Sequence, residues 1–227
     1  MGGGLPKGQI TLVYGVSNTG KTTLALQCAA AVSRGRQKVL YLDGENSFSP
    51  ERLTQIAAHD VHAVSSHIFV FKLHRFHDQT LLLEDLDRFA SRNVALIVVD
   101  TITSLYRLEL IDPWRVFASN RSLNRQLAYL LHTARTCDAA VLVTSQVHNA
   151  PQDDAASVIE PVATRVLKFW SQNILQITPG TQAGIRRIVV EKHEDGTRVG
   201  ASCVIRLTKA GIVDGLSVGV TSLSGTG

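Results

Sequence analysis

The 227-residue sequence contains few cysteines, and they are scattered along the chain. Cys28, Cys137 and Cys203 lie far apart, and two of them fall within apolar stretches. This distribution excludes a disulfide framework and the paired spacing of a zinc site. It is typical of a protein of the reducing cytoplasm, where we expect this chain to act.

Long hydrophobic runs are absent as well. No stretch approaches the ~20 apolar residues of a membrane-spanning helix, and the start, MGGGLPKG, lacks the apolar core of a signal peptide. There is no internal repeat and no domain linker, and 44% hydrophobic with 19% charged residues is typical of one large α/β domain. We expect this domain over residues 1–215, a small, polar and flexible tail over residues 216–227, and no membrane partner.

The excess of positive charge is modest. A formal net charge of +4 permits a nucleic-acid partner without requiring one. Between residues 160 and 209, eight Lys or Arg stand against four acids, so this segment alone carries a net +4. A nucleic-acid surface and an ordinary solvated face of a β-rich region are both compatible with this segment.

Apolar runs and helical periodicities alternate along the first two thirds of the chain. Strands are predicted at residues 10–14, 38–43, 68–71, 95–100 and 140–146, and helices at residues 49–57, 79–92 and about 120–136. Three further strands follow without helices between them, at residues 173–177, 186–193 and 201–207. The pattern predicts an α/β fold with a parallel central sheet, an antiparallel C-terminal extension and flanking helices.

Residues 15–22 read GVSNTGKT and match the phosphate-loop pattern G-x-x-x-x-G-K-[ST]. Small residues let backbone N–H groups surround the α- and β-phosphates, a lysine reaches the β/γ oxygens, and a hydroxyl binds Mg²⁺. A strand precedes the loop and a run of helix formers follows it, which directs a helix N-terminus at the anion. The predicted nucleotide-binding residues are Gly15, Val16, Ser17, Asn18, Thr19, Gly20, Lys21, Thr22 and Thr23.

Three other strand ends carry side chains suited to phosphoryl chemistry. Asp100 ends LIVVD and is predicted to hold Mg²⁺ through water, together with Thr22, although capping of the next turn is the alternative. LYLDGEN offers Asp43 and Glu45, and we expect Glu45 to activate the attacking water, since it lies beyond the strand. A solvated loop acid remains the alternative. Gln146 in VTSQVHN can bond the γ-phosphate and order the loop that follows.

The motifs together resemble the RecA/RadA recombinase family, and particularly its archaeal RadB branch. The resemblance covers residues 3–214 and is carried by GVSNTGKTTLALQ, LYLDGENSFSPERL, LIVVDTITSLYR, LNRQL, VTSQVH, EPVATRVLKFWSQNILQI and VVEKHEDG. It implies a RecA-like ATPase core with ATP and Mg²⁺, and a weak, DNA-dependent ATPase that assists DNA repair and recombination. It also implies single-stranded DNA, a RadA-type recombinase or another repair protein, and further copies of the chain as partners.

The resemblance assigns roles to individual residues. Lys21, Glu45 and Gln146 would form the catalytic set, with Glu45 as the water-activating acid and Gln146 as the sensor before the second DNA loop. Arg52 would stack on the adenine, because its guanidinium is planar. Tyr106 and Arg107 would begin the first DNA loop.

The sequence also departs from strand-exchange members of that family. It lacks the N-terminal DNA-binding domain and the polymerisation motif before the core, so we expect no long filaments. The second loop, within residues 148–160, has three acids and no Lys or Arg, which suits phosphate poorly. In the first loop, Arg107, Arg115 and Arg121 alternate with Trp114 and Phe117, a pattern that can hold single-stranded DNA. Alternatively, Asp112 and Pro113 start a helix whose aromatic side chains pack inward.

Two functions therefore remain open: an ATP-binding recombinase paralogue that contacts DNA, and a nucleotide-gated module that binds a recombinase or another protein with little DNA contact. A small-molecule kinase fits Gln146 and the C-terminal strands less well, and a GTPase would need an N/T-K-x-D segment. Five histidines between His59 and His77 include two His-x-x-His pairs, but no further ligands accompany them, and we expect them to be solvated. If the chain dimerises, Lys192, His193 and Arg198 are predicted to reach the neighbouring site.

Overall fold

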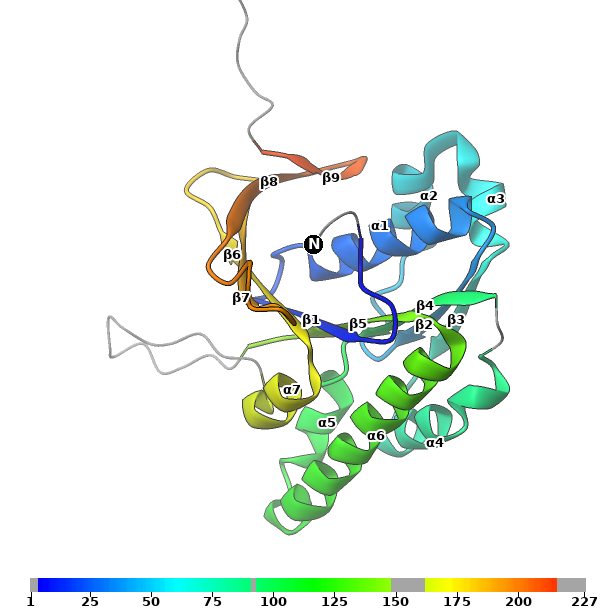
Figure 1. Ribbon diagram of the computed structural model, residues 1–227, viewed down its shortest axis with the longest axis vertical. Helices are drawn as coiled ribbons and strands as arrows, with labels where there is room; N and C mark the ends of the chain where they lie inside the picture. The colour runs from blue at the N-terminus through cyan, green and yellow to red at the C-terminus, as the bar shows by residue number, and fades with distance from the viewer. Residues whose placement is uncertain (1–3, 91–92, 148–161, 216–227) are drawn as a thin grey trace, which may run out of the picture.

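A single mixed sheet organises the molecule, which we describe from a computed structural model (Figure 1). The structure describes residues 4–90, 93–147 and 162–215. Within these residues nine strands follow the order β3-β2-β4-β5-β1-β6-β7-β8-β9. The expected tail at residues 216–227 and the expected second loop at residues 148–160 lie outside the described residues.

The parallel part of the sheet supplies the buried centre of the domain. It consists of β1 (Ile10–Tyr14), β2 (Lys38–Asp43), β3 (Ile68–Lys72), β4 (Val94–Asp100), β5 (Ala140–Ser145) and β6 (Asn173–Pro179). Every residue of β1, β4 and β5 is buried, because helices cover both faces. Asp43 pairs with Asp100 and Tyr14 with Ser145, so the carboxyl ends of these strands lie along one edge.

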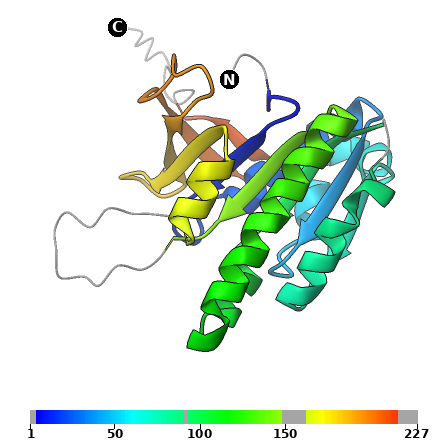
Figure 2. The same cartoon turned by 60° about the horizontal axis from the view of Figure 1, so that its bottom comes forward.

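Helices cover the two faces of this sheet separately (Figures 1 and 2). One face carries α1 (Lys21–Arg34), α2 (Pro50–Ala57), η1 (Ala58–Asp60) and α3 (Val61–Ser65). The other carries α4 (Phe76–Glu84), η2 (Leu86–Arg88), α5 (Ser104–Glu109), η3 (Pro113–Arg115), α6 (Val116–Cys137) and α7 (Thr164–Trp170). Two apolar cores result, one under α1 around Leu26 and Val98, the other under α6 around Leu12 and Leu127.

The antiparallel extension curls back toward α1 (Figure 1). After β6 it consists of β7 (Ile185–Lys192), β8 (Ser202–Thr208) and β9 (Gly211–Asp214). The side-chain amide of Gln27 on α1 makes two hydrogen bonds with the backbone of Ile212, at 3.0 and 2.7 Å. The last strand is therefore fastened to the helix that follows the first strand.

Helix boundaries depart from the sequence predictions in two places. The helix predicted at residues 79–92 begins earlier, at Phe76, and α4 ends at Glu84 before the short η2. Its start has no side-chain cap, so the usual sequence signal is missing. The long helix begins at Val116, four residues before the expected position, because Asp112 accepts the N–H of Trp114 and starts the preceding turn. In the described part of the chain, no helix is long and apolar enough to cross a membrane.

Candidate nucleotide site

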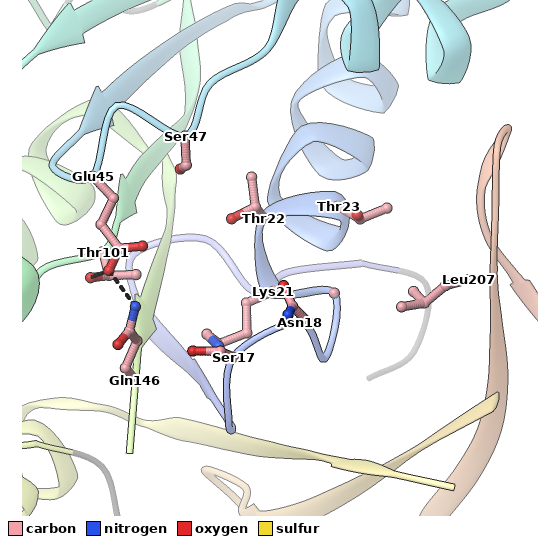
Figure 3. A pocket seen from close by; sticks show the side chains of 11 residues that line it. Ser17, Asn18, Lys21, Thr22, Thr23, Glu45, Ser47, Thr101, Gln146 and Leu207 are labelled. Atoms are coloured by element: carbon pink, nitrogen blue, oxygen red, sulfur yellow. Dashed lines mark hydrogen bonds between the residues drawn. The ribbon is translucent and has the colours of Figure 1, made fainter. Parts of the chain in front are cut away.

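A cavity of about 390 Å³ opens where the carboxyl ends of the parallel strands meet the start of α1 (Figure 3). Its lining comes from the phosphate loop, from loops after three strands, and from the antiparallel extension. The lining residues are Ser17, Asn18, Gly20, Lys21, Thr22, Thr23, Glu45, Ser47, Thr101, Gln146 and Leu207. Of the strand-end residues that the sequence singles out, Glu45 and Gln146 face one space with the phosphate loop, whereas Asp43 and Asp100 do not line it.

The glycines of the phosphate loop are required by its geometry. Gly20 precedes α1 with a φ of 98°, a conformation that side chains disfavour. A Cβ at Gly15 would lie 2.3 Å from the carbonyl oxygen of Ile177 on β6. Thr19 donates its hydroxyl to the carbonyl of Val16 at 2.9 Å, which closes the loop on itself. The loop therefore presents the N-terminus of the 14-residue α1 to the cavity, an arrangement that attracts anions.

Lys21 places one positive charge in this space. Its ammonium donates to the carbonyl oxygens of Gly15 and Val16 at 2.8 and 2.9 Å. Burial lowers the pKa of this ammonium, while the carboxylates of Asp100 and Glu45 act in the opposite direction. The cation is thus held within the loop by two carbonyls that a phosphate can replace as hydrogen-bond acceptors.

Glu45 and Gln146 meet on the side of the cavity that faces the phosphate loop (Figure 3). The Gln146 amide donates to Oε1 of Glu45 at 2.8 Å, and the hydroxyl of Thr101 donates to the same oxygen at 3.0 Å. Burial raises the pKa of Glu45, and the hydrogen bond from Thr101 works against this increase. A carboxylate with raised basicity beside a phosphate loop is suited to accepting a proton from water.

Asp43 and Asp100 are both buried but have different surroundings. Asp43 accepts the backbone N–H groups of Ser47 at 2.9 Å and Phe48 at 3.0 Å, so it shapes the loop after β2. Asp100 accepts hydroxyls of Tyr41 at 2.8 Å and Ser47 at 3.4 Å, and a third from Thr144. Burial and the Asp100 carboxylate raise the pKa of Tyr41 well above its usual value, so the phenol remains a donor.

These contacts suit the way proteins bind Mg²⁺. Thr22 lines the cavity, whereas Asp100 lies behind it and is connected to it by the Ser47 hydroxyl. Mg²⁺ commonly keeps several water ligands and takes few direct protein ligands. A hydroxyl in the cavity with a carboxylate behind it fits such an ion, which Thr22 would bind directly and Asp100 would hold through intervening groups.

Comparisons with known proteins show the family of the chain. The family described as Rad51 matches residues 1–215. A protein of Methanosphaera stadtmanae named DNA repair and recombination protein RadB is 32% identical over 196 residues, covering 86% of this chain and 83% of the relative. Its namesake in Archaeoglobus fulgidus is 34% identical over 213 residues, covering 93% and 92%. The chain belongs to the Rad51 family.

A solved structure agrees with this assignment and places the chain with RadB. The crystal structure of the RadB recombinase superposes with a TM-score of 0.78 at 33% identity, covering 94% of this chain and 93% of that one. The resemblance to the RecA/RadA family and its RadB branch is thereby confirmed, as is the RecA-like fold with its antiparallel extension.

Within this Rad51-family fold, Arg52 binds the backbone of the antiparallel extension. Its guanidinium donates to the carbonyl oxygens of Thr208 at 2.7 Å and Lys209 at 2.6 Å, and to the side chain of Gln55. It does not line the cavity, although Leu207 of the same extension does. Stacking of Arg52 on adenine remains a prediction.

The first-loop residues form an exposed tip at one end of α5 and α6. Trp114 is 93% exposed and Phe117 80% exposed, so the alternative in which both pack inward is wrong. With Leu108 and Ile111 they recur every third residue, and we call these four residues the apolar stripe. Apolar side chains at such spacing usually belong to a core, and the sequence alone therefore leaves their direction open.

The three candidate DNA-binding arginines differ in their contacts. Arg107 lies in the last turn of α5 and donates to Oε1 of Gln146 at 3.1 Å. Arg115 forms ion pairs with Glu109 at 3.0 Å and Asp112 at 3.4 Å. Arg121 is exposed on the first turns of α6.

Several residues of the site carry no local sequence signal. The cavity is also lined by Ser47, Thr101 and Leu207. Ser47 and Thr101 reach it because they lie next to motif residues, and Leu207 reaches it because the extension curls toward α1. Lys192 is bound to the carbonyls of Lys168 and Ser171 at the end of α7, so its prediction as a group reaching another copy is not supported by its contacts. No group of three or more metal-ligating side chains occurs among residues 4–90, 93–147 and 162–215, which includes the histidine segment.

Proposed function

We propose that this Rad51-family chain binds ATP with Mg²⁺, hydrolyses it slowly, and uses the bound nucleotide in DNA repair and homologous recombination in the cytoplasm. The observation that carries the proposal is the shared cavity of the phosphate loop, Glu45 and Gln146. The matched relatives are named DNA repair and recombination proteins, which supports the cellular role.

The chain's own residues divide the chemistry among them. The N–H groups at the start of α1 and the Lys21 ammonium bind the phosphates, and Glu45 accepts a proton from the attacking water. Gln146 donates to Glu45 and lines the cavity, and we infer that its amide bonds the γ-phosphate when ATP is bound. Mg²⁺, when bound, would neutralise phosphate charge, with Thr22 and Asp100 holding it.

Slow turnover follows from the number of cations at the site. Among the described residues, Lys21 is the only lysine or arginine that lines the cavity. A second cation on the transferred phosphoryl group contributes about 10³ to 10⁵ in rate in phosphoryl-transfer enzymes. We therefore infer that ATP acts mainly as a conformational signal for this chain until a neighbouring molecule supplies such a group.

The exposed tip is the proposed surface for single-stranded DNA. Trp114 and Phe117 offer faces on which bases stack, and Arg107, Arg115 and Arg121 offer charge. A second candidate, a nucleotide-gated surface for a RadA-type recombinase or another copy of the chain, is favoured by Leu108 and Ile111, which are 60% and 78% exposed. Aliphatic side chains do not stack on bases but pack well against another protein.

Replacing Glu45 by Gln tests the catalytic assignment. The amide keeps an oxygen for Thr101 and Gln146, so ATP affinity should stay within about threefold, while turnover falls by about 100-fold or more because the base is lost. Calorimetry and a radiometric single-turnover assay measure the two quantities. Undiminished hydrolysis by the folded variant would contradict the role of Glu45.

The salt dependence of DNA binding separates the two surface functions. Phosphate contacts release counterions, so affinity for single-stranded DNA should fall steeply with salt if the arginines bind the backbone. A flat or undetectable response would instead favour the protein-binding surface.

A further inference from the structure

The Gln146 side chain is held at both ends of its amide. Arg107 Nη1 donates to Oε1 at 3.1 Å, and Nε2 donates to Glu45 Oε1 at 2.8 Å. Arg107 comes from the last turn of α5, Gln146 from the residue after β5, and Glu45 from the loop after β2. Three elements that are distant in sequence therefore meet in one chain of hydrogen bonds.

The chemistry of the two partners fixes the direction of this amide. A guanidinium only donates hydrogen bonds, and an ionised carboxylate only accepts them. Gln146 satisfies both partners in one orientation alone, with its oxygen toward Arg107 and its NH₂ toward Glu45. Without Arg107, the Gln146 oxygen has no donor that fixes its direction. The amide can then rotate by half a turn, which takes its NH₂ group away from Glu45.

We propose that Arg107 is a positioning residue that keeps the Gln146 amide on Glu45 and so sets the basicity of the carboxylate at the nucleotide. The proposal rests on the function assigned to the cavity above. Arg107 does not line the cavity and acts only through Gln146. It directly precedes Leu108, the first residue of the apolar stripe, so a molecule bound at the tip can act on the site through the same side chain.

The proposal predicts the direction of a pH effect. A donor to the ionised carboxylate lowers its pKa, and the groups that face Glu45 are Gln146, Thr101, Lys21, Asp43 and Asp100. When Arg107 is lost, Gln146 no longer stays on Glu45, and the carboxylate becomes harder to ionise. The acid limb of ATP hydrolysis should then move to higher pH.

The first experiment compares Arg107→Ala, Arg107→Lys and the control Arg88→Ala. Arg88 is an exposed arginine paired with Asp85, away from the cavity, so the control removes the same charge without touching the site. Single-turnover hydrolysis is measured against pH without DNA. For Arg107→Ala we expect the midpoint of the acid limb to rise by about 0.5 to 1 pH unit, since one hydrogen bond contributes about 1 kcal/mol, with ATP affinity within about threefold. Arg107→Lys keeps a donor for Gln146, so its midpoint should lie close to that of the parent protein.

The second experiment observes the contact itself and does not depend on turnover. The side-chain ¹⁵N–H₂ signals of Gln146 are assigned by their loss in Gln146→Ala and then followed by NMR in each variant. Arg107→Ala should displace them and Arg88→Ala should not. If wild-type protein shows no Lys21-dependent hydrolysis, the proposed function fails, while displaced Gln146 signals still support the positioning contact. Unchanged signals in Arg107→Ala, or a pH midpoint equal to that of Arg88→Ala, would overturn the inference.

Discussion

The parallel strands and the antiparallel extension border the same cavity with different means. The parallel half contributes ionisable and amide side chains at its strand ends, and Glu45 and Gln146 are tied to each other. The extension contributes the apolar Leu207, which packs against Gly20, and backbone carbonyls that Arg52 binds. The parallel half thus supplies the reactive side chains, and the extension covers the cavity. Each of these two contributions can be altered separately.

The largest expected effect is on the parallel half. Lys21→Ala removes the cation that contacts the phosphates, and ATP affinity should fall about 100-fold or more, equivalent to about 3 kcal/mol. The extension should be untouched, so amide hydrogen exchange in β8 and β9 should match that of the parent. Calorimetry and exchange mass spectrometry test both halves, with Arg88→Ala as the charge-matched control. Tight ATP binding by a folded Lys21→Ala protein would mean that the phosphate loop is assigned wrongly.

An intermediate effect is expected on the extension. Arg52→Ala removes the hydrogen bonds to Thr208 and Lys209, which should lower Tm by about 2 to 4 °C and speed amide exchange in β9. Gln27→Leu releases the same strand from α1 and serves as a matched control.

Comparison of two ligands then sharpens the role of Arg52. If Arg52 also stacks on adenine, Arg52→Ala weakens ATP more than tripolyphosphate, whereas Gln27→Leu affects both equally. If Arg52→Ala weakens the binding of both ligands equally, the role of Arg52 is limited to holding the extension beside the cavity.

The smallest effect concerns the stability cost of the catalytic acid. Burial raises the pKa of Glu45, so the protonated side chain favours the folded state. This contribution to the free energy of unfolding is complete below the pKa of an unfolded Glu, about 4.3, and is lost as pH rises through the folded-state pKa. Gln at this position does not ionise, so Glu45→Gln should have a Tm about 1 °C higher than the parent at pH 7.5, and the difference should shrink toward pH 4. A difference that grows on acidification would contradict this sign.

The parts of the site that the sequence predicts are those set by neighbouring residues. Asp100 ends a buried strand, and Glu45 and Gln146 follow two neighbouring strands. Parallel strands bring their carboxyl ends to one edge of the sheet whatever the remaining details. The phosphate loop likewise depends on eight consecutive residues.

The remaining contacts depend on how distant segments fold onto one another. Arg107 and Gln146 are 39 positions apart, and Gln27 and Ile212 are 185 apart. Which side of the sheet the extension curls toward is not encoded in any local pattern, and it determines the roles of Leu207 and Arg52. The outward direction of Trp114 and Phe117 was equally hidden, because a three-residue repeat suits both a core and an exposed stripe.

The two hydrogen bonds between Gln27 and Ile212 also bear on when the nucleotide site forms during synthesis. A growing polypeptide leaves the ribosome with its N-terminus first, so the phosphate loop emerges well before β9. Until β8 and β9 emerge, the side chains of Gln27 and Arg52 lack their partners on the extension, and Leu207 does not yet cover Gly20. We therefore expect a nascent chain to contain the complete phosphate-binding motif well before it can retain a nucleotide, so that ATP capture follows the synthesis of β8 and β9.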